Sequence, residues 1–169
     1  MTTTLNASTS SGLVVTPDNS GNVLLQYNGV AAPAFSAYQS TTQSVATGTF
    51  TKVQLQTEEF DTASAFDSTT NYRFTPLVAG YYQVSGNMGW SFTSGQSVVS
   101  IYKNGSRFKD GNFSTGGTDG AQSVLSALVY LNGTTDYIEM YCYQNTGTSK
   151  NTGTGATSTF FQACLLRGA

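Results

Sequence analysis

Four carboxylates lie close together in the sequence, at Glu58, Glu59, Asp61 and Asp67. Paired carboxylates can act as the acid and the base of a glycosidase, and carboxylate oxygens are ligands for calcium, which takes six to eight of them. On one strand Glu58 and Glu59 would point to opposite faces, which makes them a poor acid–base pair. Solvated loop charges are the alternative interpretation. Calcium at these four residues is the one candidate cofactor.

The chain contains no histidine, which excludes Ser-His-Asp and Cys-His nucleophile systems and imidazole metal sites. No phosphate-binding loop and no dinucleotide fingerprint is present. Cys142 and Cys164 are too few for a structural zinc site, and both lie in apolar segments. For a protein made in a cytoplasm we expect two buried free thiols. A disulfide between neighbouring strands, which requires Cβ atoms about 3.8 Å apart, is the alternative. The sequence therefore offers no catalytic residue, and we expect a protein that is not an enzyme.

Two polar segments are candidates for contact with a partner. Residues 103–120 concentrate cations and two phenylalanines, whereas residues 145–157 have no large apolar side chain and predict a solvated, mobile loop. The alternatives are solvated loop ends or a surface that contacts a protein or an anionic sugar. The candidate contact residues are Lys103, Arg107, Phe108, Lys109, Phe113 and Lys150.

The composition predicts one all-β domain without nucleic-acid or membrane partners. The 169 residues suit a single domain, and charged residues are only 9% of them, against about a quarter in typical domains. Serine, threonine, asparagine and glycine, which favour turns and polar sheet faces, take their place. The net charge of −2 indicates no basic surface for binding nucleic acid. No apolar run approaches the roughly 20 residues of a membrane span, and no signal peptide is visible, so synthesis in a cytoplasm is expected.

The elements that must position these residues are short strands. From Tyr82 to Trp90 every second residue is apolar or small, which is typical of a strand with one buried face. Asn104-Gly105 separates two further apolar segments and predicts a tight hairpin. Residues 34–40, 49–60, 121–133, 136–144 and 158–168 predict further strands. Strands at this spacing with turns between them indicate a sandwich or a jelly roll.

Residues 1–36 predict an arm that is separate from a main domain at 37–169. The arm contains a hairpin signal, in which two apolar stretches flank a centre rich in proline, asparagine and glycine. An isolated hairpin is marginal in water, so we expect the arm to bind a partner. The candidate residues for this contact are Leu13, Val14, Val15, Val23, Leu24, Leu25 and Tyr27.

Four stretches of the sequence, in order, carry a family pattern. They are the Phe-x-x-Val strand at 50–53, "FDSTTNYRFTPLVAGYYQVSG" at 66–86, the Lys-Asn-Gly hairpin at 103–105 and the closing strand "TFFQACLLRG" at 159–168. Together they resemble the globular head domain of the C1q and tumour-necrosis-factor superfamily. The resemblance implies a ten-stranded jelly roll and a homotrimer, with some relatives binding calcium near the trimer axis. Gly80 is expected in a turn at a φ that favours glycine. The motif residues expected in the core are Phe50, Val53, Phe66, Phe74, Pro76, Gly80, Tyr82, Val84 and Trp90.

The arm also resembles leaders that precede such heads in bacteriophage virion proteins. We therefore expect a non-enzymatic structural protein on the virion surface of a tailed phage, made in the cytoplasm of the host bacterium. The leading hypothesis is a trimeric capsid decoration or cement protein, whose arm binds the major capsid protein or other virion proteins. The alternative is the receptor-binding tip of a tail or head fibre, which would recognise a host surface glycan or protein.

Overall fold

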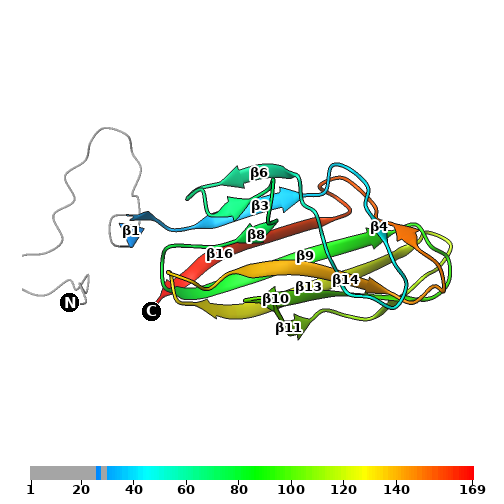
Figure 1. Cartoon of the computed structure of the whole chain (residues 1–169). Coiled ribbons are helices and arrows are strands. Elements are labelled where there is room, and N and C mark those ends of the chain that lie inside the picture. Colours follow the sequence, from blue (N-terminus) through cyan, green and yellow to red (C-terminus); the bar gives the residue numbers. More distant parts are fainter. Residues whose placement is uncertain (1–25, 28–29) are drawn as a thin grey trace, which may run out of the picture.

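The computed structural model describes residues 26–27 and 30–169, and the strands in this part form antiparallel pairs throughout. Two sheets pack face to face and make a flattened sandwich (Figure 1). The strands are β1 Gln26–Tyr27, β2 Val30–Ala31, β3 Ala34–Tyr38, β4 Ser44–Val45, β5 Thr51–Lys52, β6 Thr57–Asp61, β7 Phe66–Asp67, β8 Arg73–Phe74, β9 Gly80–Trp90, β10 Gln96–Lys103, β11 Ser106–Asp110, β12 Ser114–Thr115, β13 Ala121–Leu131, β14 Ile138–Gln144, β15 Lys150–Asn151 and β16 Phe160–Gly168.

One sheet has five strands in the order β13-β9-β16-β3-β6. The alternation from Tyr82 to Trp90 is confirmed, because β9 buries Tyr82, Val84, Met88 and Trp90 toward the other sheet. β9 pairs along its whole length with β13, with Tyr82 opposite Val129. The closing strand β16 pairs with β9 on its other side, so β9 is an interior strand and β16 the central strand of this sheet.

The second sheet has seven strands, in the order β11-β10-β14-β8-β7, with β12 also beside β10 and β5 also beside β14. The predicted hairpin at Asn104-Gly105 is confirmed. Both residues have positive φ, 53° and 76°, as a two-residue turn between twisted strands requires. Asparagine and glycine are the residues that tolerate such values of φ at little cost.

The core between the sheets is built around stacked aromatic rings. The ring centroids of Phe35 lie 4.6 Å from those of both Phe66 and Phe74. Tyr82 is fully buried, and its hydroxyl donates a 2.7 Å hydrogen bond to the Val78 carbonyl oxygen. Burial without a charged partner raises the pKa of this phenol. Val53, Pro76, Gly80 and Val84 are buried as well.

The segment 49–60 differs from the single strand predicted for it. β5 pairs with β14 in the seven-stranded sheet, whereas β6 pairs with β3 in the five-stranded sheet, so the chain crosses between the sheets. Val53 and Leu55 are fully buried along this crossing. Phe50 is a correction to the expected core, since it is only half-buried and packs on the outer surface against Tyr143, at 5.0 Å between ring centroids.

The segment 145–157 is also more ordered than the mobile loop expected from its composition. β15 within it pairs with β4, about a hundred residues earlier in the chain. The Thr152 side chain is buried, and its hydroxyl oxygen accepts a 3.0 Å hydrogen bond from the Gln43 backbone N–H. Polar side chains here satisfy backbone groups instead of remaining solvated, which composition does not reveal.

The N-terminal boundary of the sandwich falls within the predicted arm. β3 begins at Ala34, and Phe35 is part of the core, so residues 34–36 belong to the five-stranded sheet. Before it, β1 and β2 pair with Tyr27 opposite Val30. The predicted hairpin between Leu13 and Leu25 lies outside the described residues.

Candidate assembly surface

One face of the five-stranded sheet is exposed and carries most of the exposed large hydrophobic side chains. Of the nine among the described residues, six lie on this face. We call it the apolar face and define it by Phe60, Tyr81, Val124, Leu128, Tyr130 and Leu166. Leu128 is 54% exposed and Tyr130 42%, and the rings of Tyr81 and Tyr130 lie 5.4 Å apart. An apolar patch along a whole sheet marks a surface that contacts another protein.

The part of this face on β9 and β13 carries no charged side chain. The outward residues of β13, from Gln122 to Tyr130, and of β9, from Tyr81 to Gly89, are apolar, amide or hydroxyl residues or glycine. Two amides on the face donate to neighbouring hydroxyl groups. Gln83 Nε2 donates to Ser126 Oγ at 2.9 Å, and Gln162 on β16 donates through Nε2 to Ser85 Oγ at 3.0 Å. These bonds and the absence of charge lower the desolvation cost of burying this part of the face.

The outer face of the seven-stranded sheet differs, because its charges are paired with one another. Lys52 pairs with Glu139, and Arg107 pairs with Asp110. Cations and rings also alternate. The guanidinium of Arg107 lies 4.1 Å from the centroid of Phe50, and Tyr102 stacks on Tyr141 at 3.7 Å. This surface satisfies its own charges and ring faces, so it offers less to a partner than the apolar face does.

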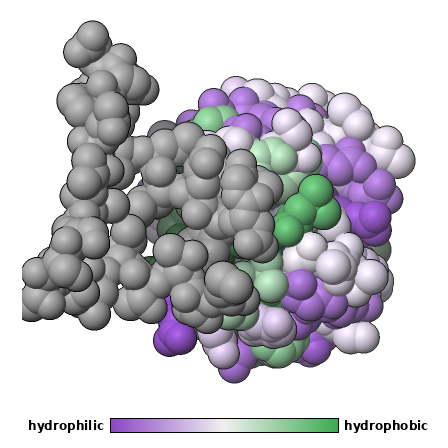
Figure 2. Space-filling view, turned by 90° about the vertical axis from the view of Figure 1, so that its left-hand side faces the viewer, coloured by the Kyte–Doolittle hydropathy of each residue, from purple (hydrophilic) through white to green (hydrophobic). Residues whose placement is uncertain are grey.

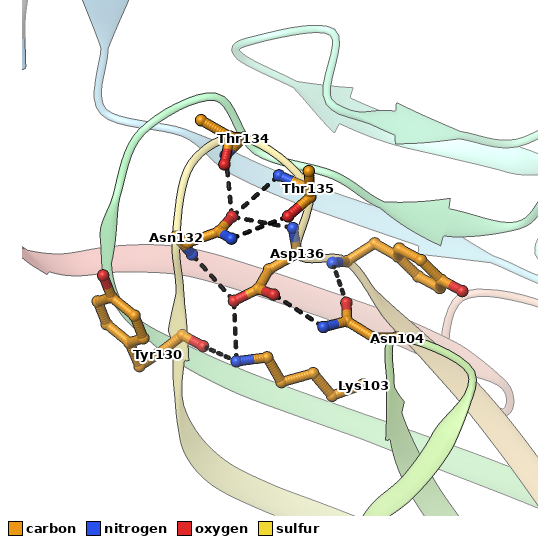
Figure 3. Close-up of polar contacts among 8 residues, drawn as sticks. Lys103, Asn104, Tyr130, Asn132, Thr134, Thr135 and Asp136 are labelled. Carbon is orange, nitrogen blue, oxygen red and sulfur yellow. Dashed lines mark hydrogen bonds and ion pairs between the residues drawn. The ribbon is translucent and has the colours of Figure 1, made fainter.

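A polar cluster joins two loops at one end of the sandwich (Figure 3). The Asn132 side-chain oxygen accepts from the backbone N–H groups of Thr134, Thr135 and Asp136. The Asp136 carboxylate accepts from Asn104 Nδ2 at 2.8 Å and pairs with Lys103 Nζ at 2.9 Å. These two partners hold the pKa of Asp136 below its ordinary value.

Lys103 also donates to the Tyr130 carbonyl oxygen at 2.7 Å (Figure 3). The cluster therefore anchors the β10–β11 hairpin to the end of β13, beside the apolar face. This role differs from the one expected for Lys103, which is fixed by internal partners instead of being presented on an exposed loop.

The four candidate calcium ligands are held apart by separate partners. Glu58 accepts from Ser68 Oγ at 2.6 Å, and Glu59 accepts from Ser36 Oγ at 2.7 Å. Asp61 accepts from the Phe66 backbone N–H at 2.7 Å. Within the residues that the structure describes, no group of three or more acidic, cysteine or histidine side chains is arranged to hold a metal ion.

Asp67 organises the turn that follows β7. Its carboxylate accepts from the backbone N–H groups of Thr70 and Thr69 and from the Asn71 side chain, at 2.9, 3.0 and 2.7 Å. The backbone bonds hold the pKa of Asp67 well below its usual range. The aspartate of the sequence motif is thus a turn-forming residue in this chain.

The remaining candidate contact residues are dispersed. Phe113 is 61% and Phe108 44% exposed, Lys109 lies 5.5 Å from the Phe108 ring, and Lys150 lies in β15 away from them. The two cysteines are free, as expected, but only Cys142 is buried. Cys164, which was also expected to be buried, is exposed because it points to the outer side of β16. Burial raises the pKa of the Cys142 thiol to about 12.

The apolar face is not among the features predicted from the sequence, although the chain contains a signal for it. Residues 121–131 are apolar at outward as well as inward positions, including Val124, Leu128 and Tyr130. A strand that is apolar on both sides is typical of burial on both sides. In the single chain only the inner side of β13 is buried, so the outer side is left for a partner.

The end of the sandwich seen in Figure 2 has a mixed surface. Hydrophobic residues form a small group near the middle of this view, and hydrophilic residues surround it on the part that is not grey. Among the described residues there is no helix with the length and apolar character of a membrane span.

No family profile and no curated protein matches the chain. Solved structures do match its fold. Murine APRIL at pH 5.0 shares 11% identity over 80% of this chain and 99% of its own, with a TM-score of 0.62. The globular domain of zebrafish complement 1qA shares 14% identity over 82% of this chain and 99% of its own, with a TM-score of 0.61.

The vertex protein P5 of phage PRD1 is also similar, with 17% identity over 80% of this chain and 97% of its own, and a TM-score of 0.61. At these identities the likenesses show the fold alone. The expected fold class is confirmed: the chain is an all-β sandwich of antiparallel sheets with the TNF/C1q-like jelly-roll fold.

Proposed function

We propose that this chain is a non-enzymatic structural protein of a phage virion that works as a homotrimer. The observation that carries the proposal is the apolar face, whose part on β9 and β13 is extended and carries no charged side chain. Interfaces between permanent partners are depleted of charge and enriched in aromatic side chains in the same way. Three copies that bury the β9 and β13 part of this face around a three-fold axis leave the seven-stranded sheet and the β3–β6 side of the face, with Phe60, outside the interface.

Within the virion, we favour capsid decoration over a fibre tip. The likeness to a phage vertex protein supports a place on a virion. The 25 residues of the arm that precede β1 extend up to roughly 80 Å at about 3.3 Å per residue, which is enough to cross neighbouring capsid subunits. Its apolar stretches can add strands to exposed sheet edges, and three arms on one trimer multiply a weak single contact.

The alternative is a receptor-binding fibre tip. The exposed rings of Phe108 and Phe113 favour it, because aromatic rings are suited to contact with a host glycan or protein. Lys109 lies beside them and adds a cation for an acidic group.

Deletion of residues 1–25 tests the decoration hypothesis without cutting the described domain, since Phe35 and the rest of β3 remain. The truncated protein is expected to stay trimeric in sedimentation and to lose its binding to capsids stripped of this protein. Full-length protein is the control for binding. A truncated trimer that still binds capsids would refute anchoring by the arm.

The position on the particle is tested by antibody-gold labelling of intact virions. Gold over the whole head supports decoration, whereas gold at tail or fibre tips supports the alternative. Particles without gold would contradict the virion assignment itself.

A further inference from the structure

A trough lies on the outer side of the five-stranded sheet, where β3 presents small residues. Its volume is about 270 Å³. Ala34 forms part of its floor, Phe60 from β6 forms one wall, and Cys164 from β16 lies on the other side. The lining residues are Ala34, Phe35, Phe60, Gln83, Ser85, Gln162, Ala163 and Cys164. None is charged, so the trough fits an apolar occupant.

The chain enters the sandwich beside this trough. β1 and β2 pair antiparallel with Gln26 opposite Ala31, so the backbone doubles back on itself just before β3 (Figure 1). Because Gln26 is opposite Ala31, β1 begins beside a residue that lies three positions before Ala34 in the trough. A segment that joins β1 from the N-terminal side therefore starts near the edge of the trough.

The backbone of residues 32–34 is already hydrogen-bonded on both sides. On one side the Leu165 N–H donates to the Pro33 carbonyl oxygen at 2.9 Å. On the other side Thr62 Oγ1 donates to the Ala32 carbonyl oxygen at 3.2 Å and accepts from the Ala34 N–H at 2.9 Å. A returning segment cannot add a strand here and must pass over a face of the sheet. The inner face is closed by the core, which leaves the outer face and its trough.

We infer that Val23, Leu24 and Leu25 pack into the trough of their own chain. This apolar run immediately precedes β1, and its side chains match an uncharged trough with one aromatic wall. Docked residues 23–25 fix the arm to the sandwich and leave Leu13, Val14 and Val15 as its free apolar stretch. The inference concerns contacts within one chain and does not rest on the virion role.

Cys164 makes the inference testable in the full-length protein, because its thiol lines the trough and is exposed in the part of the chain described. Docking of residues 23–25 is expected to slow alkylation of Cys164 by iodoacetamide about tenfold relative to a Leu24→Asp/Leu25→Asp variant, which corresponds to docking favoured by about 1.4 kcal/mol. A Leu13→Asp/Val15→Asp variant is the matched control and is expected to keep the slow rate. Buried Cys142 is expected to react only on unfolding.

A disulfide trap identifies the occupant of the trough. Leu24→Cys or Leu25→Cys is expected to form a bond with Cys164 within one chain under mild oxidation, whereas Val15→Cys is not. Equal alkylation rates in the full-length protein and in the Leu24→Asp/Leu25→Asp variant would overturn the inference. So would slow alkylation in both, or disulfides that link two chains, because a second copy would then cover the trough.

Discussion

A charge placed on the β13 part of the apolar face is expected to dissociate the proposed trimer without unfolding the protomer. Leu128 is the position of choice, because its side chain is 54% exposed on β13 and points away from the core. Complete burial of a leucine contributes about 1.5–3 kcal/mol, so burial of the exposed half contributes about 1 kcal/mol per copy. Three copies lose about 3 kcal/mol in Leu128→Glu, which weakens assembly more than a hundredfold. Burial of three carboxylates costs several kcal/mol more for each ion.

Analytical ultracentrifugation measures the outcome directly. The wild-type protein is expected near three times 17.8 kDa and the variant near 17.8 kDa, with unchanged far-ultraviolet circular dichroism. Leu77→Glu is the matched control, since Leu77 is 73% exposed but lies before β9 and outside the apolar face. A Leu128→Glu protein that remains trimeric at micromolar concentration would refute the reasoning, and so would a Leu77→Glu protein that becomes monomeric.

Three further predictions concern the stability of the sandwich. Gly80→Ala places a Cβ 2.4 Å from the Arg167 carbonyl oxygen. The free energy of unfolding, measured by urea denaturation, is therefore expected to fall by about 1–3 kcal/mol. An unchanged urea midpoint would contradict this close approach. Tyr82→Phe leaves the buried Val78 carbonyl without its donor and is expected to cost about 1–3 kcal/mol in the same assay, whereas a neutral effect would indicate a replacement donor. Folding holds the Cys142 thiol protonated, with its pKa raised from 9.0 to about 12, so its contribution is complete below pH 9 and is lost as the pH rises toward 12. Loss of this contribution should lower the free energy of unfolding by about 1.4 kcal/mol per pH unit. The Cys142→Ala variant should therefore show a flatter dependence of the free energy of unfolding on pH between pH 9 and 10. An equal dependence in both proteins would contradict a buried, protonated thiol at Cys142.

Local patterns predict the parts of this fold that local physics determines. The alternation of β9 depends only on the two-residue period of a strand, and the hairpin at Asn104-Gly105 depends only on which residues tolerate positive φ. Both features are read from short windows of sequence. The order of strands in the sheets is implied by the family resemblance and cannot be obtained from such windows.

The features that the sequence analysis misses depend on distant partners. Residues 49–60 look like one strand, and only the different neighbours of β5 and β6 reveal the crossing between the sheets. The polar segment 145–157 is ordered by pairing with β4, far away in the chain. Gly80 has no positive φ in the structure, and its small size is required by the end of β16 instead of by a turn.

The carboxylates show the same limit for the candidate site. Their closeness in sequence suggests that they bind one ion together. In the folded chain each carboxylate instead accepts a hydrogen bond from a different hydroxyl or backbone N–H. The apolar face is missed because its members come from four strands, and no single window contains them.

The placement of the chain ends has a practical consequence for display of foreign peptides. β1 and the C-terminal residue lie at the same end of the sandwich, whereas β4 and its partner β15 lie at the opposite end (Figure 1). A cargo fused after Ala169 would emerge at the end of the sandwich that carries β1. An insertion at Gly147, where nothing lies within 4 Å of the position of a Cβ, would project from the opposite end. The internal loop next to β15 therefore presents an epitope away from β1 and from the C-terminal residue.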